Sequence, residues 1–71
     1  MKNKTAKIIG KEHGTGSCDY MRHYTLLYRG KEYVETLTNE FRDAYNVGDV
    51  IYVDTWQYKG HLNFRMCKKI N

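Results

Sequence analysis

The sequence predicts an all-β protein that forms one small domain of five strands. Polar and apolar residues alternate through much of the chain, which contains seven tyrosines, two phenylalanines and one tryptophan. Two-residue turn signals, Arg29-Gly30 and Lys59-Gly60, separate the alternating runs. The 71 residues, 41% hydrophobic and 28% charged, are typical of a globular domain near the lower size limit for a single core. We therefore expect residues 1–71 to be one domain.

The first strand is expected over Lys4–His13. Residues 14–17, with the sequence GTGS, are interpreted as a loop, because a lone G-x-G followed by no helix does not make a dinucleotide site. The second strand is expected over residues 18–28, where β-branched and aromatic residues are frequent, and the third over residues 31–38.

The turn at Arg29-Gly30 aligns the second and third strands so that Leu26 faces Tyr33 and Thr25 faces Val34. One face of this pair then carries mostly aromatic and apolar residues: Cys18, Tyr20, Tyr24, Leu26, Tyr28, Tyr33 and Leu37. The pattern favours a core position for this face over a tyrosine platform for nucleic acid. Buried phenols need hydrogen-bond partners, so some of Tyr20, Tyr28 and Tyr33 are expected to reach the rim.

Residues 39–49 break the alternation and predict a short helix. Asn39 can cap a helix, and Phe41 and Tyr45 are four residues apart on one helical face. About two turns are expected, ending near residues 46–48, where Gly48 leads into the fourth strand.

The last hairpin, with strands over residues 47–57 and 62–70, can be aligned from a turn at Lys59-Gly60. The turn predicts three pairs: Thr55 with Phe64, Val53 with Met66 and Ile51 with Lys68. The core face would carry Ile51, Val53, Leu62, Phe64 and Met66. The polar face would carry Tyr52, Asp54 and Trp56 opposite Cys67, Arg65 and Asn63. This places Trp56 on the polar face, and a one-residue slip would reverse the two faces.

Five strands with a short helix between the third and fourth match the OB-fold, a partly open Greek-key barrel, and an SH3-like barrel is the alternative. The stretch YTLLYRGKEYVETLT…YNVGDVIYV, over about residues 23–53, resembles a pattern common to small barrel domains of unknown function. In that pattern tyrosines flank a Gly-Lys turn and V-G-D introduces a hydrophobic strand. The resemblance implies a small barrel and names no activity. After Val53 the sequence departs from it, with DTWQYKGH in place of an acidic-Pro ending.

The net charge of +4 is unevenly distributed. The first eleven residues contain four lysines and no acid, the last seventeen contain four cations and no acid, and the middle contains four cations and eight acids. If the two ends of the chain lie side by side, they form one basic face suited to nucleic acid or to an acidic protein surface. The alternative is that these lysines protect strand edges from aggregation.

No catalytic, metal or cofactor site is expected. Cys18 and Cys67 are far apart in sequence and in no C-x-x-C pair, so two free thiols are expected rather than a disulfide or a zinc site. The histidines are scattered. His23 with Glu35 or Tyr24 is the one arrangement that could serve acid–base cleavage of RNA, and a surface role for His23 is favoured over it.

A non-enzymatic binding module is therefore predicted, which binds single-stranded nucleic acid through the last hairpin and the basic edge strands. OB-folds bind nucleic acid across their second and third strands, framed by the first and last hairpin loops, here residues 13–17 and 57–61. The predicted binding residues are Trp56, Tyr58, Lys59, Arg65, Tyr52, Arg22 and Lys69. For Trp56 the alternative is a ring that folds over the barrel rim.

The second hypothesis is a protein-binding module, such as a small phage-encoded inhibitor of a host defence or nucleic-acid enzyme, with an acidic protein surface as the partner. No apolar run approaches the length of a membrane span and no signal peptide is evident, so a cytoplasmic location is expected. Open strand edges could pair copies of the chain into a homo-oligomer.

Overall fold

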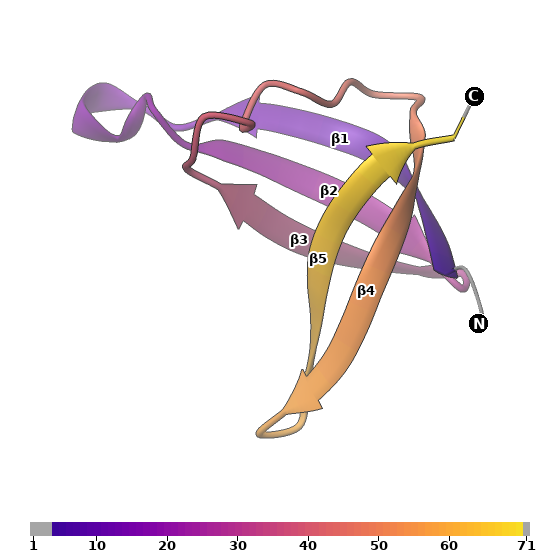
Figure 1. Cartoon of the computed structure of the whole chain (residues 1–71). Helices are drawn as coiled ribbons and strands as arrows, with labels where there is room; N and C mark the ends of the chain where they lie inside the picture. The colour runs from indigo at the N-terminus through magenta and orange to yellow at the C-terminus, as the bar shows by residue number, and fades with distance from the viewer. Residues whose placement is uncertain (1–3, 71) are drawn as a thin grey trace.

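The computed structural model describes residues 4–70 as one antiparallel sheet that curls into a half-barrel (Figure 1). Its strands are β1 (Lys4–His13), β2 (Arg22–Tyr28), β3 (Lys31–Leu37), β4 (Val50–Tyr58) and β5 (His61–Lys69). Their order in the sheet is β3-β2-β1-β4-β5. The prediction of an all-β domain with five strands is confirmed, and the architecture is consistent with a small OB-like or SH3-like barrel.

The central strand, β1, pairs with a different strand along each of its halves. Residues Lys4 to Lys7 pair with β4, and residues Lys7 to His13 pair with β2. The register between β1 and β2 shifts next to Gly10, and such a bulge bends a strand and increases its twist. A Cβ at Gly10 would lie 3.1 Å from the Thr25 hydroxyl oxygen, so glycine lets the strands approach closely at this bend.

Both predicted hairpin turns are present and share one geometry. Arg29 and Gly30 have φ values of 52° and 80°, and Lys59 and Gly60 have values of 52° and 79°. Positive φ at both central residues is the mark of the type I′ turn, whose twist matches that of the flanking strands. The β2–β3 turn sets the predicted register, with Leu26 opposite Tyr33.

The β4–β5 hairpin has the predicted register over most of its length. Thr55 lies opposite Phe64 and Val53 opposite Met66. The prediction for Ile51 is wrong, because Ile51 pairs with Lys69 instead of Lys68. A register shift between Ile51 and Val53 inserts one extra residue in β5, and turn chemistry at the other end of the hairpin carries no information about it.

The helix predicted between the third and fourth strands is not formed. Residues 38–49 make a series of turns instead, with Arg42 N–H donating to the Asn39 carbonyl and Ala44 N–H donating to the Phe41 carbonyl. Asn39 does cap this segment locally, because its Oδ1 accepts from the Phe41 N–H at 2.9 Å. A helix this short gains few backbone bonds for the cost of its first turn. Contacts with the barrel decide its conformation instead.

The one helical turn in residues 4–70 is a 3₁₀ turn, η1 (Gly16–Cys18), in the β1–β2 connection. The second strand consequently begins at Arg22 and not at Cys18 as predicted. Gly16 has a φ of 60° and starts this turn, whereas the sequence pattern predicts a loop over residues 14–17 and a strand from Cys18.

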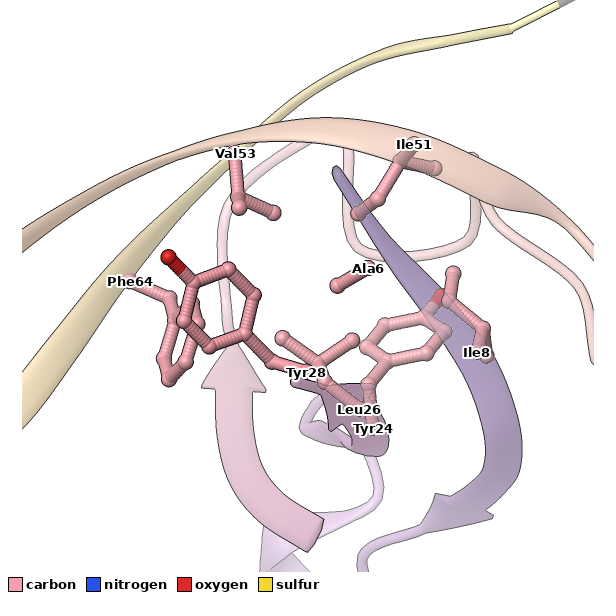
Figure 2. Close-up of a cluster of buried hydrophobic side chains, with 8 residues drawn as sticks. All are labelled: Ala6, Ile8, Tyr24, Leu26, Tyr28, Ile51, Val53 and Phe64. Atoms are coloured by element: carbon pink, nitrogen blue, oxygen red, sulfur yellow. The ribbon is translucent and has the colours of Figure 1, made fainter. Parts of the chain in front are cut away.

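The core lies on the concave face of the curled sheet, where eight side chains converge from β1, β2, β4 and β5 (Figure 2). These are Ala6, Ile8, Tyr24, Leu26, Tyr28, Ile51, Val53 and Phe64. Tyr33, Leu37, Tyr45, Leu62 and Met66 pack against them and are partly buried. The predicted core faces of both hairpins are therefore confirmed, except for Cys18 and Tyr20, which precede β2 and are exposed.

The buried phenols find hydrogen-bond partners in the segments that close the barrel. The Tyr24 hydroxyl donates to the Arg42 carbonyl, and the Tyr45 hydroxyl donates to the Cys67 carbonyl at 2.8 Å. Of the three tyrosines expected near the rim, Tyr20 is 48% exposed, whereas Tyr28 is buried. Tyr24, the fully buried tyrosine of this face, is thus satisfied by backbone acceptors, as a buried hydroxyl requires.

An ion-pair cluster holds segment 38–49 on one end of the barrel. The Asp43 carboxylate accepts from the Arg22 Nε at 2.8 Å and lies 3.4 Å from the Lys11 Nζ. Lys11 also donates to the Tyr45 carbonyl at 2.9 Å. Hydrogen bonding from Arg22 is the largest effect that lowers the pKa of Asp43, and the two nearby positive charges act in the same direction.

Candidate functional site

The β4–β5 hairpin extends beyond the other strands of the sheet (Figure 1). The described part of β1 begins at Lys4, opposite Val53, and β4 continues for five more residues to Tyr58. Residues 54–65 therefore form a projecting two-stranded ribbon. One side of this ribbon continues the concave core face, and the other, the outer face, is directed away from the core.

The outer face of the ribbon carries a column of aromatic rings along β4. Trp56 is 51% exposed and Tyr58 is 61% exposed. Tyr52 lies further back on the same face and is half-buried. Successive side chains alternate between faces, so the burial of Ile51 and Val53 places all three aromatics outward. The prediction that Trp56 occupies the polar face is confirmed, and its ring does not fold into the core.

Polar side chains of β5 lie directly across from this aromatic column. Asn63 pairs with Trp56, His61 pairs with Tyr58, and all four residues lie in the projecting ribbon. The Asn63 carboxamide donates only a long bond of 3.3 Å, to the His61 carbonyl. Asn63 therefore lies beside the Trp56 ring with hydrogen-bonding capacity to spare. Sequence reasoning placed Asn63 on this face without assigning it to the site.

A charge pair lies behind the two exposed rings. Arg65 and Asp54 are cross-strand partners and form a hydrogen-bonded ion pair, as the alignment predicted. This bond and the negative charge of Asp54 raise the pKa of Arg65. Both side chains are more than half exposed, and exposed pairs contribute little to stability. Arg65 can therefore exchange Asp54 for another anion at little expense to the fold.

The turn adds a second cation at the tip of the ribbon. The Lys59 Nζ lies 5.3 Å from the centroid of the Tyr58 ring. Lys59 takes part in no ion pair with residues 4–70. A positive charge beside an exposed ring suits a ligand that carries both a planar group and a negative charge. We call Trp56 and Tyr58 the aromatic platform.

Two predicted binding residues lie elsewhere. Arg22 is on the concave side at the opposite end of β2, where its side chain is 11% exposed and paired with Asp43. Lys69 lies near the far end of β5, and its Nζ is 3.6 Å from Asp49. The structure thus brings together Tyr52, Trp56, Tyr58, Lys59 and Arg65, and leaves Arg22 and Lys69 as partners of acidic residues.

The route across the second and third strands, expected from OB-folds, is less favourable here. The β1–β2 connection and the β4–β5 turn project in different directions (Figure 1), so they do not frame one surface. The outer face of β2 and β3 carries no lysine or arginine in the described structure: its residues are His23, Thr25, Leu27, Glu32, Val34 and Thr36. A nucleic acid would find no cation there.

The one arrangement considered for acid–base chemistry is separated by the sheet. His23 faces outward and its Nδ1 lies 2.8 Å from the Thr36 hydroxyl oxygen. Tyr24 and Glu35, which are cross-strand partners, occupy the opposite, concave side. His23 therefore cannot share a substrate with either of them across the sheet.

Both cysteines are free thiols, as predicted, with Cys18 in the β1–β2 connection and Cys67 on β5. Within residues 4–70, no three His, Cys, Asp or Glu side chains are grouped in a way that could hold a metal ion. The same residues contain no helix with the length and apolar character needed to cross a membrane. Comparisons with protein families, curated proteins and solved structures find no match to this chain.

Proposed function

We propose that this protein is a non-enzymatic binding module that takes single-stranded nucleic acid on the outer face of the β4–β5 hairpin. The observation that carries the proposal is the aromatic platform. Two large rings, Trp56 and Tyr58, stand half or more exposed at positions i and i+2 of one strand face. Neither ring is needed to complete the core, which is filled from the opposite face.

The chemistry of the platform fits the bases of a flexible strand. Bases stack on aromatic side chains with about 1–3 kcal/mol each, and stacking tolerates any base. Rings at i and i+2 lie about 7 Å apart along a strand, which leaves room for a base on each ring. A duplex keeps its bases stacked on one another, so a single strand is the better partner.

Charge supports the same partner. Lys59 and Arg65 flank the platform on either side, and Asp54 is the one acid on this part of the outer face within residues 4–70. Asp54 is already paired with Arg65. The protein as a whole carries a net charge of +4, which favours approach to a polyanion.

The test is a fluorescence titration that uses Trp56 as its own reporter, because it is the only tryptophan of the chain. Short single strands of DNA or RNA should quench its emission at low salt, and affinity should fall steeply as salt rises. Trp56→Ala removes the reporter, so its affinity is measured with a labelled strand. The substitution should weaken binding about 5- to 150-fold, which corresponds to the loss of one stacked base. Trp56→Phe should retain part of the affinity.

Phe41 provides the matched control. It is 61% exposed and lies in segment 38–49, outside the projecting ribbon that carries the aromatic platform. Phe41→Ala should leave affinity unchanged. Equal losses for Phe41→Ala and Trp56→Ala would contradict the proposal, and so would an absence of binding at low salt. Capture of one acidic protein without affinity for nucleic acid would instead support the second hypothesis, that the hairpin binds a protein surface.

A further inference from the structure

A second group of cations lies close to the hairpin, on the concave side of the barrel. Lys4, Arg29 and Lys31 form no ion pair with any acid in residues 4–70. Three of the cations nearer segment 38–49, by contrast, are paired with its acidic side chains. Arg42, within segment 38–49, also forms no ion pair with the described acids, but it stands alone there, whereas three unpaired cations lie at the end from which the hairpin projects.

Strand pairing brings these three residues together from distant parts of the sequence. Leu27 pairs with Lys7, so the β2–β3 turn that holds Arg29 lies beside the beginning of β1 (Figure 1). Lys31 is the cross-strand partner of Tyr28, directly after that turn. Lys4 stands at the junction with the hairpin. We call Lys4, Arg29 and Lys31 the basic mouth.

Two of the three cations are held in place by neighbouring side chains. The Lys4 Nζ donates to the Thr55 hydroxyl oxygen at 2.9 Å. The Arg29 guanidinium carbon lies 5.2 Å from the centroid of the Tyr28 ring. Positively charged groups already fixed in position lose little conformational entropy when an anion binds.

The floor of the mouth is aromatic and partly open. The Tyr28 and Phe64 ring centroids are 5.2 Å apart, and the Tyr33 ring lies 5.0 Å from Phe64. Tyr33 and Leu62 remain partly exposed at this end of the core. The Tyr28 ring displaces water from one side of the Arg29 guanidinium, which strengthens its attraction for an anion relative to a fully solvated cation.

We propose that the basic mouth binds the phosphates of the strand whose bases stack on the aromatic platform. This inference deepens the proposed function and depends on it. Lys4 connects the two surfaces, because Thr55, its partner, is the residue immediately before Trp56 on β4. A nucleic-acid strand that leaves the aromatic platform and crosses the β4 edge of the ribbon reaches Lys4 first and then the β2–β3 turn. The basic mouth lengthens the binding surface and adds no base specificity.

The experiment compares salt dependence between matched charge variants. The variant Lys4→Gln/Arg29→Asn/Lys31→Gln removes the mouth and keeps the turn, because asparagine readily adopts the positive φ that Arg29 has. Each phosphate contact to a single strand contributes about 0.7 to the slope of log affinity against log salt. The variant should therefore lower the slope by about 2, and circular dichroism should show an intact fold.

The control is Lys68→Gln, which removes an exposed lysine near the opposite end of β5. It should leave the slope unchanged. A further readout is strand length: lengthening a short oligonucleotide should raise the affinity of the wild type more than that of the mouth variant.

The outcomes separate this inference from the proposed function. If the wild type binds and Trp56→Ala weakens binding, but the mouth variant keeps the wild-type slope, the inference is wrong and the platform stands. If Lys68→Gln alone lowers the slope by about 0.7, the value of one phosphate contact, the contacts are unspecific and the inference is again wrong. An absence of binding by the wild type at low salt would overturn both.

Discussion

Tyr33 on β3 and Phe64 on β5 have ring centroids 5.0 Å apart, although the strands that carry them are the two edges of the sheet. The barrel is therefore closed on this side by side chains and not by a backbone ladder. Tyr28 also contacts Phe64 edge-on, and the Tyr45 hydroxyl reaches the β5 backbone from segment 38–49. Aromatic contacts of this kind stabilise by about 0.5–1.5 kcal/mol beyond the area they bury.

Phe64→Ala should unfold much of the population. The ring is 5% exposed and is the main β5 contribution to the core, so its removal should lower the free energy of unfolding by about 3–5 kcal/mol. The free energy of unfolding of a domain this small is little more than that. Tyr33→Phe keeps the ring contact and should change stability by less than about 1 kcal/mol. Urea unfolding, monitored by circular dichroism, measures both variants. Equal losses of unfolding free energy would show that the rings of Tyr33 and Phe64 do not hold β3 and β5 together.

Glu35→Gln should stabilise the protein at neutral pH. Glu35 lies on the concave side of β3, and burial raises its pKa, with a backbone hydrogen bond from Phe64 opposing the shift. The folded state therefore binds this proton more tightly than the unfolded chain, and stability falls as the pH rises from the ordinary glutamate range through the raised pKa. Glutamine keeps the acceptor oxygen and lacks the charge, so the stability of the Glu35→Gln variant should not fall over this pH range. Glu35→Ala, which lacks the acceptor, is the control. A pH dependence that is unchanged in Glu35→Gln would contradict the assignment.

Asp43 should stabilise the protein at neutral pH and lose this effect in acid, the opposite of Glu35. Its pKa is lowered by Arg22 and Lys11, so its ionised form stabilises the fold above the ordinary aspartate range. That contribution should disappear as the pH falls through the lowered pKa. Asp43→Asn should therefore be less stable than the wild type at neutral pH and equally stable in strong acid. Urea midpoints across the acid range give the test, and a constant difference between the two proteins would exclude the ion pairs as its cause.

Asp54→Asn should strengthen binding of single-stranded nucleic acid. The substitution removes the acid beside the aromatic platform and frees Arg65 for a phosphate. The salt slope should become steeper by about 0.7, the value of one added contact. Stability should change little, because the pair is exposed. Glu40→Gln, on segment 38–49, is the control for loss of a distant acid. Weaker binding by Asp54→Asn would show that Asp54 itself contacts the ligand.

Features of the structure that depend on near neighbours in the chain could be predicted well. Both type I′ turns follow from Arg29-Gly30 and Lys59-Gly60, and each turn sets the register of the strands beside it. Register together with alternation then places Trp56 outward and Phe64 inward. Five of the seven predicted binding residues lie together for this reason, since all five belong to residues 52–65 of one hairpin, whereas Lys69 lies at the far end of β5.

Several of the predictions that failed needed information from elsewhere in the fold. Segment 38–49 has a helical pattern, but hydrogen bonds from Tyr24 and Lys11 hold it as turns. Arg22 and Lys69 looked available to a ligand, yet Asp43 and Asp49 are brought to them by the fold.

By itself the sequence determined the strands, the turns and the two faces of each hairpin, because those features depend on side-chain alternation and on backbone preferences within a few residues. Only the tertiary structure decided the bend at Gly10, the contact of Tyr33 and Phe64 between the two edge strands, and the gathering of Lys4, Arg29 and Lys31. Arg29 and Lys31 belong to the acidic middle of the chain, and Lys4 to its basic start. They meet because antiparallel pairing and sheet curvature join residues that no local pattern connects.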